Sequence, residues 1–176
     1  MKVNLRKNVN ISLCLEKNEF FKQFNIYETI DCNEFIYRKE FFGNRYNMVK
    51  HRLMISKADA TTPILEIKFA KLLDTIEGTS LEGQHLSGKK LILVGKVNFK
   101  LIICYYYENK FKYSIKNINI PFSTFIIIPK DTCMRDSVNL IYEIEDLSIV
   151  YLCKNKIFIS VTPLIEYLDE YLDEEV

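Results

Sequence analysis

The chain has 176 residues, of which 48% are hydrophobic and 27% are charged. This length and composition predict one folded domain and exclude a disordered chain. Because 24 Lys and Arg balance 23 Asp and Glu, the net charge is +1, which argues against a nucleic-acid binder held by bulk charge. No apolar run approaches the roughly 20 residues that cross a bilayer, so no membrane span is expected.

The first 60 residues carry weak strand patterns. Apolar residues alternate with polar ones from Val9 to Leu13, as in a half-buried strand. Residues 20–30 fit either a strand pair or a short helical turn. We expect residues 1–60 to pack on the core or to extend it as strands. Residues 1–15 lack a continuous apolar stretch, which predicts no secretory signal peptide and a protein that stays inside the cell that makes it.

The central segment, residues 61–163, is expected to form strands joined by tight turns. Alternation is clearest at residues 91–107, where a bend or bulge is expected near Gly95. A shorter alternating run, with or without a phase shift, covers residues 64–76. A turn after residue 107 predicts a hairpin, and the apolar phase of its returning strand changes after Asn117, which predicts another bulge.

Further strands follow, and together they define the fold class. Residues 122–128 are apolar on both faces, which favours a place in the core. Residues 138–151 alternate with a slip at Asp146, and residues 157–161 follow a tight turn. The 23 Ile, 12 Phe and 11 Tyr against 3 Ala favour pleated surfaces over helices. We predict an all-β, mainly antiparallel fold, a β-sandwich or open barrel with a short C-terminal helix.

The C-terminal segment, residues 164–176, is acidic and amphipathic. It holds six acidic residues and no basic one. On a helix, five apolar residues would form one stripe and a candidate interaction site: Leu164, Tyr167, Leu168, Tyr171 and Leu172. A helix of about 10 residues is marginal alone in water, so the stripe is expected to dock, either on the chain's own β domain or on a partner. The remaining alternative is a solvated tail.

A glycine-rich stretch comes close to a phosphate-binding motif but departs from it. Gly83 to Lys90 spells GxxxxGKK, where a P-loop needs Ser or Thr at the last position and a helix after it. A strand is expected here instead. The glycines are therefore expected to shape a connection by allowing positive φ at Gly78, Gly83 and Gly88. On this view the substitution Lys89→Ala leaves stability unchanged.

Other catalytic or metal-binding sets are weak. Of the two histidines, His85 could act as the base for a Cys104 nucleophile. Such a set also needs a third group that orients the base, and none is evident. The five cysteines are widely spaced, without a CxxC or CxxH pair, and are expected to be reduced structural residues; oxidative cross-linking late in the protein's life is the alternative. We therefore expect no catalytic residues, no metal and no cofactor.

Three blocks between residues 78 and 129 resemble the SPOCS domain, which is found in sporulation and spore-coat proteins of clostridia and related spore formers. The blocks are GTSLEGQ, GKKL and PFSTFIIIP, in that order. Residues 21–30 resemble the family's upstream segment, and the likeness extends over most of residues 21–165. The motif residues are Gly78, Thr79, Ser80, Glu82, Gly83, Gln84, Gly88, Lys89, Pro121, Phe122, Ser123, Phe125 and Pro129.

The resemblance implies a non-enzymatic protein–protein interaction module in spore-envelope assembly. Such a protein is made in the cytoplasm of the mother cell and recruited to the spore surface, coat or exosporium, by other spore-envelope proteins. An alternative is a homo-oligomeric structural subunit that self-assembles into a lattice or fibre, because residues 122–128 are β-prone and uncharged. An enzyme or small-ligand protein is a third hypothesis, which a pocket with converging titratable groups would favour.

Overall fold

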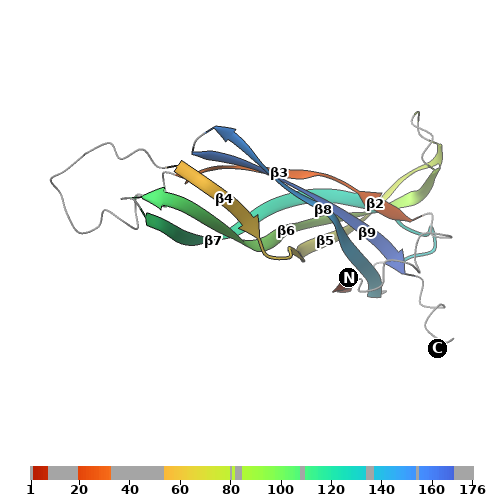
Figure 1. Cartoon of the computed structure of the whole chain (residues 1–176). Helices are drawn as coiled ribbons and strands as arrows, with labels where there is room; N and C mark the ends of the chain where they lie inside the picture. The colour runs from red at the N-terminus through yellow and green to blue at the C-terminus, as the bar shows by residue number, and fades with distance from the viewer. Residues whose placement is uncertain are drawn as a thin grey trace.

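The structure, a computed structural model, describes residues 2–7, 20–32, 54–79, 81, 85–107, 110–133, 137–153 and 155–168. All the elements delimited within these ranges are strands. They are β1 (Lys2–Lys7), β2 (Phe21–Gln23), β3 (Ile26–Asp31), β4 (Met54–Ala60), β5 (Ile64–Thr79), β6 (His85–Tyr107), β7 (Lys110–Ile127), β8 (Ser137–Cys153) and β9 (Lys156–Leu168). They form two sheets that stack as an elongated β-sandwich (Figure 1). The predicted all-β, mainly antiparallel fold is confirmed.

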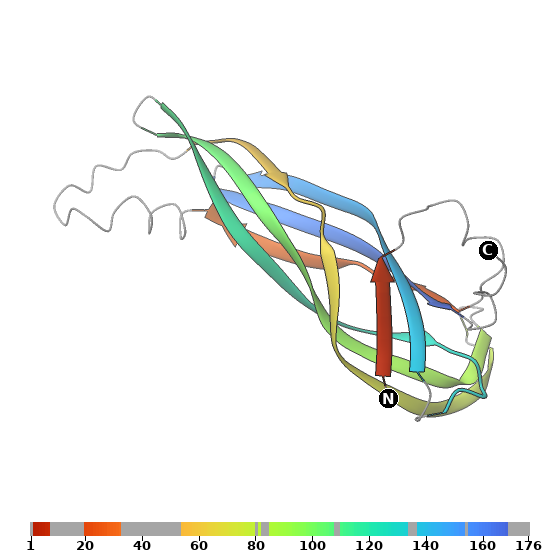
Figure 2. The same ribbon diagram turned by 90° about the horizontal axis from the view of Figure 1, so that it is seen from below.

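The first sheet is built around the antiparallel pair β8 and β9. On one side of β9, β2 and β3 lie end to end, and both are antiparallel to it. On the far side of β8, β1 pairs in parallel with residues 137–142, the single parallel pairing in the described ranges. Figure 2 shows β1 and this part of β8 side by side at one end of the sandwich.

The second sheet is built around β6, its longest strand. β7 pairs with one side of β6 without a register shift, from Lys90 opposite Ile127 to Tyr107 opposite Lys110. β5 and β4 share the other side, β5 along residues 85–98 and β4 along residues 101–106. Among the described strands, none pairs with the second edge of β7, so β7 is an edge strand.

The core lies between the two sheets and follows the alternation of the strands. Its fully buried large side chains come mainly from β6 and β9, and include Leu91, Leu93, Leu101, Ile103, Ile157, Ile159 and Ile165. The rings of Phe24 and Phe122, 5.3 Å apart, connect the two sheets. Phe122 and residues 126–128 are buried as well, as the sequence predicts for this segment.

Register shifts occur at two of the places where the apolar phase slips, but not at a third. β5 shifts between Ile67 and Phe69, so the irregularity expected near Gly95 lies in the strand opposite that glycine. β8 shifts at Asp146, as expected. β7 continues without a shift past Asn117, so the bulge predicted there is wrong. Because the alternation is unbroken, the apolar side chains of β7 before Asn117 point outward.

The predicted C-terminal helix is not seen. β9 continues as a strand to Leu168, with Ile165 opposite Tyr142 of β8 on one side and opposite Lys22 of β2 on the other. Strands on both sides satisfy the backbone hydrogen bonds of this segment, which removes the advantage of a helix, and Ile165 enters the core. Tyr171 and Leu172 lie outside the described residues.

Candidate interaction surface

The described motif residues of the family-like blocks lie in one half of the second sheet, from its middle to the end at His85. Gly78 and Thr79 end β5, opposite Leu86 and His85 of β6. The other described motif residues are Gly88 and Lys89 in β6, Pro121, Phe122, Ser123 and Phe125 in β7, and Pro129 directly after β7. Ser80, Glu82, Gly83 and Gln84 lie outside the described residues. The three blocks therefore meet on adjacent strands.

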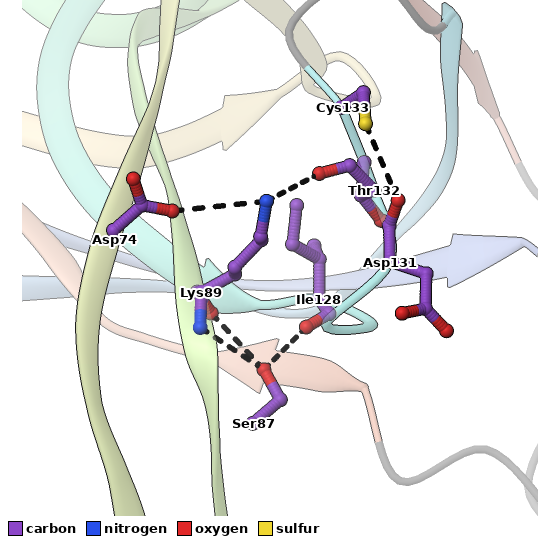
Figure 3. A network of polar contacts seen from close by, with 7 residues as sticks. All are labelled: Asp74, Ser87, Lys89, Ile128, Asp131, Thr132 and Cys133. Carbon is purple, nitrogen blue, oxygen red and sulfur yellow. Dashed lines mark hydrogen bonds and ion pairs between the residues drawn. The ribbon is translucent and has the colours of Figure 1, made fainter.

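A polar network ties these strands together (Figure 3). The hydroxyl of Ser87 donates to the carbonyl of Ile128 over 2.5 Å and accepts from the backbone N–H of Lys89 over 3.2 Å. The Lys89 amine donates to the backbone oxygen of Thr132 over 2.8 Å and lies 3.7 Å from Oδ1 of Asp74. Lys89 thus holds the segment after β7 against β6, and the expectation that its loss leaves stability unchanged is revised.

The glycine-rich stretch has the expected backbone conformations where it is described. φ is positive at Gly78 and Gly88, and Gly83 lies outside the described residues. Gly88 sits at a register shift between β5 and β6 with φ of +90°, which side-chain-bearing residues rarely adopt. The residues after Gly88 continue β6, so the predicted strand at this position is confirmed.

The residues considered for nucleophilic chemistry are not brought together. His85 and Cys104 lie near opposite ends of β6, and 19 residues at about 3.3 Å each separate them by about 60 Å. Within the described ranges, no group of three or more His, Cys, Asp or Glu residues is placed to hold a metal ion.

Cys32 is the most protected of the described cysteines. Its side chain is fully buried just beyond β3, and its backbone N–H donates to the carbonyl of Asn155 over 2.7 Å. Burial, reinforced by the charge of Asp31, raises the pKa of the thiol to about 12. Cys104 is half-buried, whereas Cys133 and Cys153 are exposed, and all four are thiols.

The other end of the second sheet carries an exposed apolar surface on its outer face. Three cross-strand rows of β4, β6 and β7 form it, here named the outer patch: Met54, Tyr106 and Phe111; Lys57, Cys104 and Tyr113; and Asp59, Ile102 and Ile115. Phe111, Tyr113 and Ile115 are each more than 60% exposed. Several large apolar side chains this exposed and this close together mark a surface for interaction.

A groove runs through the outer patch. It has a volume of about 470 Å³ and is lined by Ser56, Lys57, Asp59, Ile102, Cys104, Phe111 and Tyr113. Lys57 and Asp59 form an exposed ion pair of 3.2 Å and neutralise each other. The rings of Phe111 and Tyr106 meet edge to face at 5.3 Å, which orders the aromatic wall of the groove. The lining can therefore receive apolar and aromatic side chains.

One exposed lysine borders the outer patch. Lys100 follows the row of Asp59 and Ile102 on the same face of β6 and is exposed. The three lysines of β7 alternate with Phe111, Tyr113 and Ile115 and therefore point to the opposite face. An acidic ligand would meet a favourable charge at Lys100 beside an apolar centre.

The candidate interaction residues of the C-terminal segment pack within the chain where they are described. Leu164, Tyr167 and Leu168 are half-buried in β9, and the ring of Tyr167 lies 6.2 Å from that of Phe20. This region of β9 therefore docks on the chain's own β domain, although as a strand. The outer patch was missed from the sequence because its β7 residues were placed on a core face before a bulge. An unbroken alternation back from Ile118 would have placed them outside.

Comparisons with protein-family models, curated proteins and solved structures found no match. The resemblance to the SPOCS domain therefore stays a prediction. No helix in the part of the chain that the structure describes is long and apolar enough to cross a membrane.

Proposed function

We propose that the chain is a protein–protein interaction module without enzymatic activity that takes part in assembling the spore envelope. The observation that carries the interaction role is the outer patch. Phe111, Tyr113 and Ile115 are exposed on a regular strand, where polar side chains would make the protein more soluble. Their exposure has a physical rationale if a partner covers them.

The spore-envelope part of the proposal rests on the three sequence blocks that resemble the SPOCS domain. The network around Lys89 gives these blocks a structural role, because it fixes the end of the sheet opposite the outer patch. The proposed protein is made in the mother cell and recruited to the coat or exosporium by other spore-envelope proteins.

A fluorescent fusion imaged through sporulation tests this proposal. We expect the signal to move from the mother-cell cytoplasm to a ring around the forespore. The double variant Phe111→Ser, Tyr113→Ser is expected to stay diffuse. Phe69→Ser is the matched control, because Phe69 is similarly exposed on the second sheet but belongs to β5, outside the patch. Diffuse signal in vegetative cells, with none around the forespore, would overturn the proposal.

Self-assembly into a lattice or fibre is the second candidate, and the open edge of β7 favours it. No described strand pairs with this edge, and a strand edge of this kind can pair with a second copy through backbone hydrogen bonds. Within residues 122–128, the side chains of Phe122 and residues 126–128 are buried in the core. A contact between copies is therefore expected to use the backbone edge or the outer patch. Light scattering across a concentration series separates a monomer from an assembling subunit.

A further inference from the structure

We propose that the outer patch of one copy binds the C-terminal residues 169–176 of a second copy, so that copies join head to tail. The inference deepens the self-assembly candidate and rests on the outer patch being an interaction surface. The occupant is identified by charge, by side-chain type and by reach.

Charge complementarity is the first argument. Residues 169–176 read DEYLDEEV, with five acidic residues and no basic one. Lys100 is exposed beside the outer patch on the same face, and Asp59 within the patch is already paired with Lys57. The described charges on this face therefore favour an acidic ligand.

Side-chain type is the second argument. Within residues 169–176, the apolar residues are Tyr171, Leu172 and Val176. The groove of about 470 Å³ between Phe111, Tyr113 and Ile102 offers an apolar and aromatic lining for such side chains. Aromatic and aliphatic anchors in a groove, surrounded by charged contacts, form the usual anatomy of a specific interface.

Reach is the third argument, and it requires a second copy. β9 runs away from the outer patch toward the opposite end of the sandwich (Figure 1). Ile165 lies level with Phe125, because Lys22 pairs with Ile165 and its amine sits 5.0 Å from the Phe125 ring. From Phe125 back to Tyr113 is 12 residues, or about 40 Å.

Residues 169–176 are too short to cover that distance within one molecule. These eight residues reach at most about 29 Å from Leu168 when fully extended. They therefore cannot lie on the outer patch of their own chain. Because donor and acceptor sit at opposite ends of each copy, the contact is heterologous and propagates into a filament instead of closing as a dimer.

A mixing experiment tests the proposal. One variant lacks residues 169–176 but keeps the outer patch. The other carries Phe111→Ser and Tyr113→Ser but keeps the C-terminal segment. Each variant alone is expected to be monomeric by light scattering at a concentration where the unmodified chain associates. The equimolar mixture is expected to form a one-to-one complex, because each partner supplies one half of the interface.

The outcomes are decisive in both directions. A mixture that stays monomeric while the unmodified chain associates would overturn the proposal. Association of the truncated variant alone would also overturn it, because the contact would then not need residues 169–176. An unmodified chain that is monomeric at high concentration, with no affinity for the peptide of residues 169–176, would do the same. Circular dichroism of each variant checks that the β fold is retained.

Peptide binding supplies a second measurement. A labelled peptide of residues 169–176 is titrated with the truncated chain and followed by fluorescence anisotropy. The substitution Tyr113→Ser is expected to weaken binding about tenfold or more, and Lys100→Glu to weaken it most at low salt. The control Phe69→Ser is expected to leave the dissociation constant unchanged. These purified-protein results are independent of forespore imaging, so either proposal can fail alone.

Discussion

Gly95 of β6 lies directly opposite Phe122 of β7, and the phenyl ring folds over the position where a side chain on residue 95 would begin. A Cβ atom there would lie 2.8 Å from Cζ of the ring. It would also come closer to the carbonyl oxygen of Glu66 than van der Waals radii permit. The register shift in β5 brings that carbonyl to the glycine, so Gly95 allows β5, β6 and β7 to pack closely at this point.

We expect Gly95→Ala to destabilise the protein by about 3 kcal/mol, because one of the clashing atoms belongs to the backbone and cannot move alone. The midpoint of urea unfolding reports the loss. Val94→Ala is the matched control, since Val94 is the neighbouring residue but faces solvent, and should cost less than about 1 kcal/mol. An unchanged midpoint in Gly95→Ala would contradict the close packing.

Lys89→Met should lower the free energy of unfolding by about 1–2 kcal/mol, because it keeps the aliphatic stem but removes the hydrogen bond to Thr132. Asp74→Asn should have almost no effect, because the Asp74 carboxylate is largely exposed and lies 3.7 Å from the amine. Thermal unfolding of both variants separates the two contacts. Equal losses in the two variants would mean that the ion pair, and not the backbone contact, carries the stabilisation.

Cys32 should make stability depend on pH in the alkaline range. In the unfolded chain the thiol ionises at its ordinary pKa of 9.0, whereas in the folded state burial raises the pKa to about 12. The stabilisation is therefore complete below pH 9 and is lost between pH 9 and pH 12. The stability difference between the unmodified chain and Cys32→Ala should shrink by about 1.4 kcal/mol between pH 8 and pH 10.

Thiol labelling checks the burial of Cys32 independently of pH. Thiol reagents at neutral pH should label Cys133 and Cys153 quickly and Cys32 only after unfolding. Labelling of Cys32 at the rate of the exposed thiols would be incompatible with its burial.

Nested truncations should separate the strand β9 from the residues after it. Removing residues 169–176 should change stability by less than about 0.5 kcal/mol in dilute solution. Removing residues 164–176 also removes Ile165 from the core and strips pairing from β2 and β8, so cooperative unfolding should be lost or greatly weakened. The substitution Ile165→Ala, with an expected cost of about 2–5 kcal/mol, measures the core contribution without shortening the chain. Similar thermal midpoints for both truncations would speak against the strand.

The strands that the sequence predicts well are those with one buried and one solvated face. β6 is the clearest, because Leu91, Leu93, Leu101 and Ile103 alternate with residues that face outward. Local pattern and tertiary burial agree there, so period and face follow from the residues alone. The phase slip at Asp146 was predictable for the same reason, since residues on both sides of it pack against the core.

The misses have a common physical cause, which is that the decisive partner is distant in the chain. The spacing of Leu164, Tyr167 and Leu168 fits a helix, but β2 lies more than 140 residues earlier and converts the segment into a strand. Phe111 and Tyr113 look like core residues because apolar side chains usually are, and only the unbroken pairing of β7 with β6 turns them outward. A prediction that assigns every apolar face of a strand to the core therefore does not find the outer patch.

The parallel pairing of β1 has a consequence for biosynthesis. Asn4 bonds to Asn139 through their side-chain amides over 3.0 Å, and 135 residues separate them in the chain. At about 5–20 residues per second, the ribosome needs roughly 7–27 s to make the second partner after the first. During that interval β1 has no β8 to pair with, although it is made before every other strand that the structure describes. The earliest of these strands is therefore among the last to be secured by its pairing partner, and it stays exposed to non-native pairing until then.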